Sequence, residues 1–232
     1  MSTPACSVGS SSEESPSRSS SLKAALSPKG LDIPEKGSAG ASGDLAPLAH
    51  MTLAMIGEGK MTYKGKKISA RNALKRASIA PLNLHPKEGL SLVNGTQVST
   101  ALAIKSMLDS DVLLKTADAV GALSVESSLS SGDVFKSSIH QLKKHPGQRI
   151  TARNVLKMIS GSEIVASHKE CGTIQDPYSF RCIPHIHGSC RDSIKHAGDI
   201  INNEINSVSD NPVILDNGKV AYSGHFHAEP VA

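Results

Sequence analysis

The chain has 232 residues, of which 38% are hydrophobic and 20% charged, and a formal net charge of +4. These values are typical of a folded globular protein and exclude wholesale disorder. The basic residues are scattered rather than gathered on one stripe, which excludes a dedicated nucleic-acid-binding protein. No stretch approaches the roughly 20 apolar residues that a membrane span needs. We therefore expect a cytoplasmic protein with no nucleic-acid or membrane partner.

Aromatic residues are sparse, because the sequence has no Trp, three Tyr and three Phe. The core must then be built from Leu, Ile, Val, Ala and Met, a set typical of packed helices rather than of a β-sandwich. We therefore expect a mainly α fold. The four cysteines show no spacing typical of a disulfide framework and are expected to be reduced thiols: Cys6, Cys171, Cys182 and Cys190.

Residues 1–30 form a segment dominated by Ser, Pro and charge. Such a segment cannot bury enough apolar surface to offset its ordering entropy, so a disordered tail is predicted. A mitochondrial transit peptide is the alternative, since Arg18 and Lys23 lie among serines. Glu13 and Glu14 weigh against it, because transit peptides are poor in acidic residues.

Beyond residue 30 the hydrophobic pattern becomes helical. Apolar residues recur at helical spacing over residues 45–56 and 68–77, and Ser69 is placed to cap the second of these helices. A longer helix is predicted over residues 96–129, which contain no proline. Another is predicted over residues 191–207. Helices of this length indicate a bundle of long helices.

A small hairpin is predicted near the C-terminal end of the sequence. Asn211-Pro212 stops the preceding helix. Two short apolar runs then flank the turn-forming residues 216–218, Asp-Asn-Gly, within residues 213–222.

Residues 37–44, Gly-Ser-Ala-Gly-Ala-Ser-Gly-Asp, are the most unusual stretch of the sequence. Their three glycines at a spacing of three are similar to those of phosphate-binding loops. However, no Lys-Ser or Lys-Thr follows and no apolar strand precedes them, which argues against a nucleotide site. A turn before the helix at Leu45, with Asp44 as its N-cap, explains the same residues structurally.

The tripeptide Ala41-Ser42-Gly43 lies in a longer run, Gly-Ala-Ser-Gly-Asp-Leu-Ala-Pro-Leu-Ala-His, that resembles the aromatic amino acid ammonia-lyases. The resemblance covers residues 34–232. Four further blocks follow in the family's order: 86–97, 175–182, 204–212 and 226–230. Gln97, His50 and the Asp-Pro-Tyr at 176–178 are more similar to the histidine-specific members than to the phenylalanine-specific ones.

The resemblance implies a cofactor made from the chain itself. In this family the amide nitrogen matching Gly43 attacks the carbonyl carbon matching Ala41, and loss of two waters leaves 4-methylidene-imidazole-5-one (MIO). The residue types suit this chemistry, because Gly43 has no Cβ to hinder the bend and Ser42 supplies the eliminated hydroxyl. Asp44 is expected to assist the cyclisation.

The resemblance also implies roles for residues outside the tripeptide. Asn94 would hold the MIO oxygen, and Arg181 would bind the substrate carboxylate with its planar guanidinium. Tyr178 and Gln175 would be polar partners of the same site, and Phe226 would pack beside MIO. The structural alternatives are a helix cap for Asn94, a surface ion pair for Arg181, ordinary hydrogen bonds for Tyr178 and Gln175, and core packing for Phe226.

The reaction implied is elimination of ammonia from L-histidine to give trans-urocanate, the first step of histidine degradation. The fold implied is a long-helix bundle like that of the fumarase and aspartase superfamily, assembled as a homotetramer. Two alternatives stay open. One is a phenylalanine or tyrosine ammonia-lyase; the other is a catalytically deficient, truncated paralogue that associates with full-length lyase subunits.

The sequence departs from the family's pattern at both ends. The family's general base is a tyrosine in a block before the glycine-rich segment, and a further carboxylate and helical portion follow residues 226–230. Residues 31–232 therefore resemble a central portion, from a truncated product or an incomplete gene model, and we expect little histidine elimination by the chain alone. His225 also stands where asparagine is expected.

Cys182, His185, His187 and Cys190 are four possible zinc ligands within nine residues. Their spacing matches none of the standard structural zinc sites. We expect no bound metal.

Overall fold

The computed structural model of the chain describes residues 30–34, 36–169, 172 and 174–231. The predicted tail at residues 1–30 lies outside them, apart from Gly30. The chain divides into two compact units. The first, here the loop unit, comprises Met1–Val98 and Ser209–His227; the second, the helical unit, comprises Ser99–Val208 and Ala228–Ala232.

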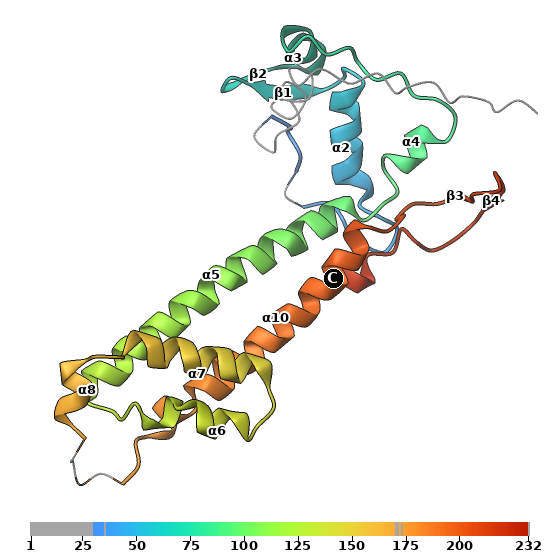
Figure 1. Cartoon of the computed structure of the whole chain (residues 1–232). Helices are drawn as coiled ribbons and strands as arrows, with labels where there is room; N and C mark the ends of the chain where they lie inside the picture. The colour runs from blue at the N-terminus through green and yellow to red at the C-terminus, as the bar shows by residue number, and fades with distance from the viewer. Residues whose placement is uncertain (1–29, 35, 170–171, 173, 232) are drawn as a thin grey trace, which may run out of the picture. The chain divides into compact units, whose positions relative to one another are not determined.

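The described residues are mainly helical, as the sequence predicted (Figure 1). In chain order the elements are α2 (Leu45–Met55), β1 (Lys60–Tyr63), β2 (Lys66–Ser69), α3 (Ala70–Arg76), α4 (Glu88–Ser91), α5 (Gln97–Ser127), η1 (Asp133–Phe135), α6 (Ser137–Gln141), α7 (Pro146–Met158), α8 (Glu163–Ser167), α9 (Tyr178–Arg181), α10 (Ile183–Ile205), β3 (Val213–Ile214), β4 (Val220–Ala221) and η2 (Glu229–Val231). None of the helices in the described ranges has both the length and the apolar character that a membrane crossing requires.

Within the loop unit, α2 and α3 confirm the two predicted short helices. Ser69 caps α3 as expected, since its hydroxyl accepts a hydrogen bond from the backbone N–H of Asn72 at 3.4 Å. Residues 66–69 are nevertheless a strand rather than the start of that helix, because β2 pairs antiparallel with β1. The turn between them, Lys64-Gly65, has positive φ at both residues, the backbone of a tight two-residue hairpin.

A second hairpin, β3 with β4, also belongs to the loop unit and confirms the predicted one. Val213 pairs with Ala221 and Ile214 with Val220. The predicted turn residues close it, with Gly218 at a φ of 76°.

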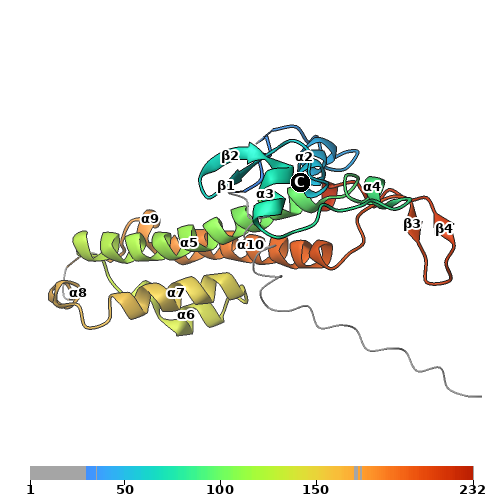
Figure 2. The same cartoon turned by 90° about the horizontal axis from the view of Figure 1, so that it is seen from above.

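The helical unit is built on two long antiparallel helices, α5 and α10 (Figure 2). The long helix predicted at residues 96–129 is confirmed by α5. The other begins at Ile183, eight residues before its predicted start at residue 191. The predicted start was wrong because a proline such as Pro184 usually ends a helical pattern, whereas in the first turn of a helix proline is well tolerated.

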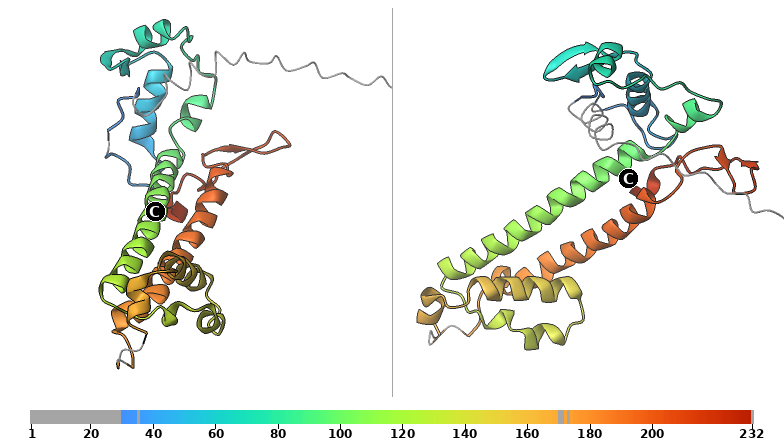
Figure 3. Two further views of the ribbon diagram at one scale, coloured as in Figure 1. Left: turned by 60° about the vertical axis from the view of Figure 1, so that its left-hand side comes forward. Right: turned by 45° about the horizontal axis from the view of Figure 1, so that its top comes forward.

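Helix α7 packs closely against α10, as the two views of Figure 3 show from other sides. At the contact a Cβ added to Gly147 would lie 2.9 Å from the carbonyl carbon of Gly188, so glycine is required for the approach. The apolar core beside this crossing comes from several elements: Ala122, Val125, Phe135, Val155, Ile159 and Ile183.

A buried carboxylate ties three helices of this unit together. Asp118 on α5 is 0% exposed and accepts hydrogen bonds from Asn154 on α7 at 2.8 Å and from Arg191 on α10 at 2.9 Å. The Nδ1 atom of His187 lies 3.1 Å from its other oxygen. A buried charge is tolerated only when it is paired and hydrogen-bonded, and Asp118 meets both conditions.

Candidate active site

The glycine-rich segment of the loop unit bends at the tripeptide Ala41-Ser42-Gly43. Gly43 has a φ of +80°, in the left-handed region that favours glycine. A backbone bridge pairs Ala41 with Gly43 across Ser42. The tripeptide therefore doubles back on itself, which is the shape that a reaction between its two ends would need.

Asn94 contacts this bend directly. Its Nδ2 donates to the carbonyl oxygen of Ser42 at 2.7 Å. A Cβ on Gly43 would lie 3.1 Å from both the side chain and the backbone of Asn94, so the missing side chain at position 43 leaves room for this close approach. The side-chain amide of Asn94 therefore binds the tripeptide, while its predicted role toward the cofactor stays a prediction. Asn94 is itself held by its N–H, which donates to the carbonyl of Leu90 at the end of α4.

Asp44 follows the tripeptide and is 0% exposed. Its carboxylate accepts a hydrogen bond from the hydroxyl of Ser38 at 2.6 Å, and its backbone N–H donates to the carbonyl of Gly95 at 2.8 Å. The predicted N-cap is wrong in one respect. Asp44 occupies the N-cap position of α2, but its side chain makes no capping hydrogen bond, because its backbone is not in the extended conformation of such caps and Ser38 engages the carboxylate.

Residues 209–210 bind the chain on both sides of the turn at Asn94. Lys87 and Asp210 form an ion pair at 2.5 Å, and the hydroxyl of Ser209 accepts a hydrogen bond from Gln97 at 3.2 Å. Burial works to raise the pKa of Asp210, but hydrogen bonds from Lys87 and Ser91 outweigh it and hold that pKa below its ordinary value. Sequence reasoning missed these supports, although Lys87 and Asp210 lie in two of the blocks that carry the resemblance.

Phe226 belongs to the same unit as the tripeptide and is half-buried. Its predicted packing beside the cofactor stays a prediction. His225, the departure from the family's pattern, is exposed, and its N–H donates weakly to the hydroxyl of Ser223 at 3.4 Å.

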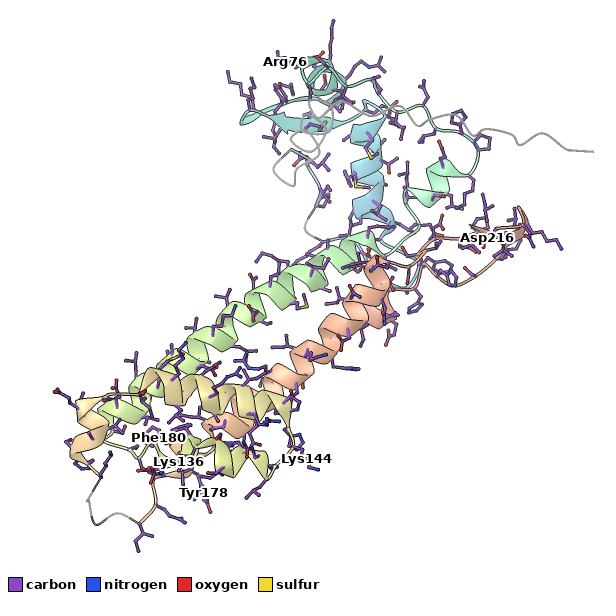
Figure 4. All side chains as sticks on the ribbon, in the orientation of Figure 1. Arg76, Lys136, Lys144, Tyr178, Phe180 and Asp216 are labelled. Atoms are coloured by element: carbon purple, nitrogen blue, oxygen red, sulfur yellow. The ribbon has the colours of Figure 1, made fainter. Side chains whose placement is uncertain are left out.

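The other predicted site residues belong to the helical unit and cluster at α9. The Nε of Arg181 donates to the carbonyl oxygen of Asp176 at 2.7 Å, and its guanidinium lies 4.8 Å from the centre of the Tyr178 ring. The carboxylate of Asp176 accepts in turn from the backbone N–H of Ser131 at 2.9 Å. Figure 4 labels Tyr178 and Phe180 on this short helix. The sequence did not predict that Asp176 contacts both Arg181 and Ser131.

Arg181 and Gln175 line a cavity of about 860 Å³ within the helical unit, together with residues 129–134 and Lys136. Among the described residues no carboxylate forms an ion pair with Arg181, so the surface-ion-pair alternative is not what the structure shows. Because its contacts use Nε and the ring-facing side, the terminal edge of the guanidinium suits a carboxylate from a ligand. Tyr178 is 76% exposed.

Of the predicted zinc-ligand candidates around α10, His187 faces Asp118, whereas the Nδ1 atom of His185 is buried without a hydrogen-bond partner among the described residues. No group of three or more possible ligands within the described ranges has the arrangement of a metal site. Cys182 and Cys190 are free thiols, whereas Cys6 and Cys171 lie outside the described ranges. Burial lowers the pKa of the His185 imidazole, and the nearby charges of Lys143 and His140 lower it further.

Comparison with protein families gives one match, to the model described as aromatic amino acid lyase, over residues 25–232. Histidine ammonia-lyases of Burkholderia cenocepacia and Burkholderia multivorans are each 49% identical over 201 residues, which is 86% of this chain. The chain spans about 40% of the length of these curated relatives.

Solved structures give the same picture for the fold. Histidine ammonia-lyase from Trypanosoma cruzi matches with a TM-score of 0.74 and 31% identity, covering 87% of this chain and 37% of that one. Tyrosine aminomutase from Streptomyces globisporus matches with a TM-score of 0.77 and 32% identity, covering 87% of this chain and 41% of that one. Phenylalanine ammonia-lyase from Rhodosporidium toruloides gives a TM-score of 0.77 at 28% identity, covering 94% of this chain and 34% of that one.

Proposed function

This chain belongs to the aromatic amino acid lyase family, and we propose that it carries the cofactor-forming loop and the substrate-carboxylate clamp of a histidine ammonia-lyase. The proposal has three parts, which concern the cofactor, the substrate and the assembly.

The cofactor is proposed to form from Ala41-Ser42-Gly43. The amide nitrogen of Gly43 bonds to the carbonyl carbon of Ala41, whose oxygen leaves as water with the protons of the Gly43 and Ser42 amides. The Cα hydrogen and the hydroxyl of Ser42 leave as the second water. Both steps are dehydrations, so neither needs an oxidant or a reductant.

The observation that carries this proposal is the hydrogen bond from Asn94 to the carbonyl oxygen of Ser42 at 2.7 Å. That oxygen would become the carbonyl oxygen attached to the ring after cyclisation. A donor fixed on it draws electron density out of the ring and strengthens the electrophile that MIO supplies to the reaction. The fit of the residues is further supported by the bend at Gly43, where a side chain would crowd Asn94 at 3.1 Å.

The substrate is proposed to be L-histidine, which would lose ammonia to give trans-urocanate in the first step of histidine degradation. The relatives named histidine ammonia-lyase at 49% identity support this substrate. Arg181 would bind the substrate carboxylate through its terminal amino groups, with Tyr178 supporting the guanidinium plane and Gln175 adding a polar contact. Phe226 would pack beside the cofactor.

The assembly is proposed to be a homotetramer or an association with full-length lyase subunits. Helix α5 exposes a row of large apolar side chains that a single soluble chain rarely leaves uncovered: Leu102 60%, Val112 62%, Leu113 69% and Leu123 63%. A non-catalytic paralogue could use the same row of side chains to dock onto a lyase subunit, so the exposed row fits that alternative as well.

One assay tests the proposed substrate, the phenylalanine alternative and the docking paralogue. L-histidine or L-phenylalanine is added to the purified chain, either alone or mixed with a full-length lyase subunit. We expect the added chain to increase absorbance from urocanate and not from cinnamate, and the Ser42→Ala chain to add nothing. Cinnamate formation would favour the phenylalanine alternative. Binding to the subunit with equal effect from the wild-type and Ser42→Ala chains would favour the docking paralogue.

A further inference from the structure

The side chain of Ser38 bridges the two ends of the loop that contains the tripeptide. Ser38 stands before residues 39–43 and Asp44 stands after them. The hydroxyl of Ser38 donates to the Asp44 carboxylate at 2.6 Å and accepts from the N–H of Gly40 at 3.1 Å. One hydroxyl therefore joins the two ends of the loop and also fixes a residue inside it.

The two ends of this bridge differ in how firmly they are held. Asp44 is fully buried, its N–H is bonded to Gly95, and its carbonyl accepts from the N–H of Leu48 at 3.0 Å. Ser38 is exposed, so little packing holds it in place. The hydrogen bond to Asp44 thus joins an exposed residue before the tripeptide to a buried residue after it.

Ring closure depends on such an attachment. The amide nitrogen of Gly43 must be kept against the carbonyl carbon of Ala41, and an open loop would spend most of its time in other conformations. A hydrogen bond from a hydroxyl to a carboxylate is charge-assisted, which makes it stronger than one between neutral groups.

We propose that Ser38 is a positioning residue for the cyclisation of Ala41-Ser42-Gly43, because its bridge between Asp44 and Gly40 holds the loop closed. This inference rests on the proposed function, since it concerns how the cofactor of that site is made. Ser38 exchanges no atom with the tripeptide. Its part is to restrict the loop and to aim the Asp44 carboxylate.

The test follows the mass of the full chain during cell-free synthesis stopped at intervals. Ser38→Ala should lose the two waters about tenfold to a hundredfold more slowly than the wild type, as expected for the loss of one charge-assisted hydrogen bond. Ser38→Thr keeps the hydroxyl and should restore the rate. Ser69→Ala is the matched control: it removes another serine hydroxyl that accepts a backbone hydrogen bond in the loop unit, but outside the loop. It should mature like the wild type.

The outcomes separate this inference from the proposed function. Maturation of Ser38→Ala at the wild-type rate overturns the inference while the cofactor proposal stands. Loss of helical circular dichroism in Ser38→Ala, with Ser69→Ala folded, also overturns it, because the bond would then be structural. A folded wild type that never loses water overturns the cofactor proposal and this inference with it.

Discussion

Asp44 in the loop unit and Asp118 in the helical unit are both 0% exposed, yet their surroundings differ. Asp118 accepts from Arg191 and Asn154 and faces His187, so it joins α5 to α7 and α10. Asp44 accepts from the hydroxyl of Ser38, only six residues away, and fixes the shape of one loop. One buried carboxylate therefore stabilises the packing of three helices, whereas the other restrains the backbone of a single loop.

The largest expected effect on stability is that of Asp118→Ala. Removal of the carboxylate leaves Arg191 and His187 without their partner, and we expect the free energy of unfolding to fall by about 3–5 kcal/mol. Urea unfolding followed by circular dichroism measures this change. Asp109→Ala is the control, since it removes only the exposed pair with Lys105 and should cost about 0.5 kcal/mol or less. A loss no larger for Asp118→Ala than for the control would contradict the role given to Asp118.

Gly43→Ala tests the role of the bend in the loop unit. A Cβ there would make a tight contact with Asn94 at 3.1 Å and the backbone is in the left-handed region, so we expect no ring formation and a stability loss of about 1–3 kcal/mol. Gly59→Ala is the matched control, because its φ of +71° carries similar strain but no atom lies within 4 Å of the added Cβ. Intact mass and urea unfolding of both variants separate the effect of the contact with Asn94 from that of backbone strain. Normal ring formation in Gly43→Ala would show that Asn94 need not approach so closely.

Arg181→Lys should weaken substrate binding while leaving the fold unchanged. Lysine keeps the charge but not the planar fork, and the loss should be on the order of 1.5–3 kcal/mol in affinity for L-histidine. Isothermal titration calorimetry on the assembled protein measures it, with Arg76→Lys, an exposed arginine of α3 (Figure 4), as the control. If both variants bind L-histidine equally well, Arg181 is not the carboxylate clamp.

The smallest expected effect concerns pH and the helical unit. Burial holds the pKa of His185 below its ordinary value of 6.5, so the unfolded chain takes up a proton first as the pH falls. Stability from this residue should therefore be complete above about pH 6.5 and decline below it, toward the lower pKa of the folded state. Melting temperatures between pH 7.5 and 5.5 check this. His185→Gln should flatten the profile, and an unchanged slope would assign it to other groups.

The sequence predicted the elements that have a long apolar periodicity or a recognisable turn motif. The apolar face of residues 96–129 gave α5, and the Asp-Asn-Gly turn gave the β3–β4 hairpin. The β1–β2 hairpin was missed because its strands are short and lysine-rich and its turn, Lys64-Gly65, lacks the Asn or Asp that marks most tight hairpins. Helices α6 and α8 are too short for periodicity to show.

The candidate site was predictable only in part for a related reason. Motif blocks pointed to the tripeptide, Asn94 and Arg181, whose residue types suit the chemistry by themselves. The supports were not predicted, because the bonds of Asp210 to Lys87 and of Asp176 to Ser131 join residues far apart in the sequence. Contacts of that kind follow from the fold and leave no local pattern.

The mass of one tryptic peptide shows directly whether the loop unit makes its own cofactor. Trypsin should release residues 37–60, which contain the whole tripeptide and end at Lys60. From the folded chain this peptide should lack the mass of two waters, and the same peptide from Ser42→Ala should not. A full, unmodified mass in a folded sample would contradict the central claim.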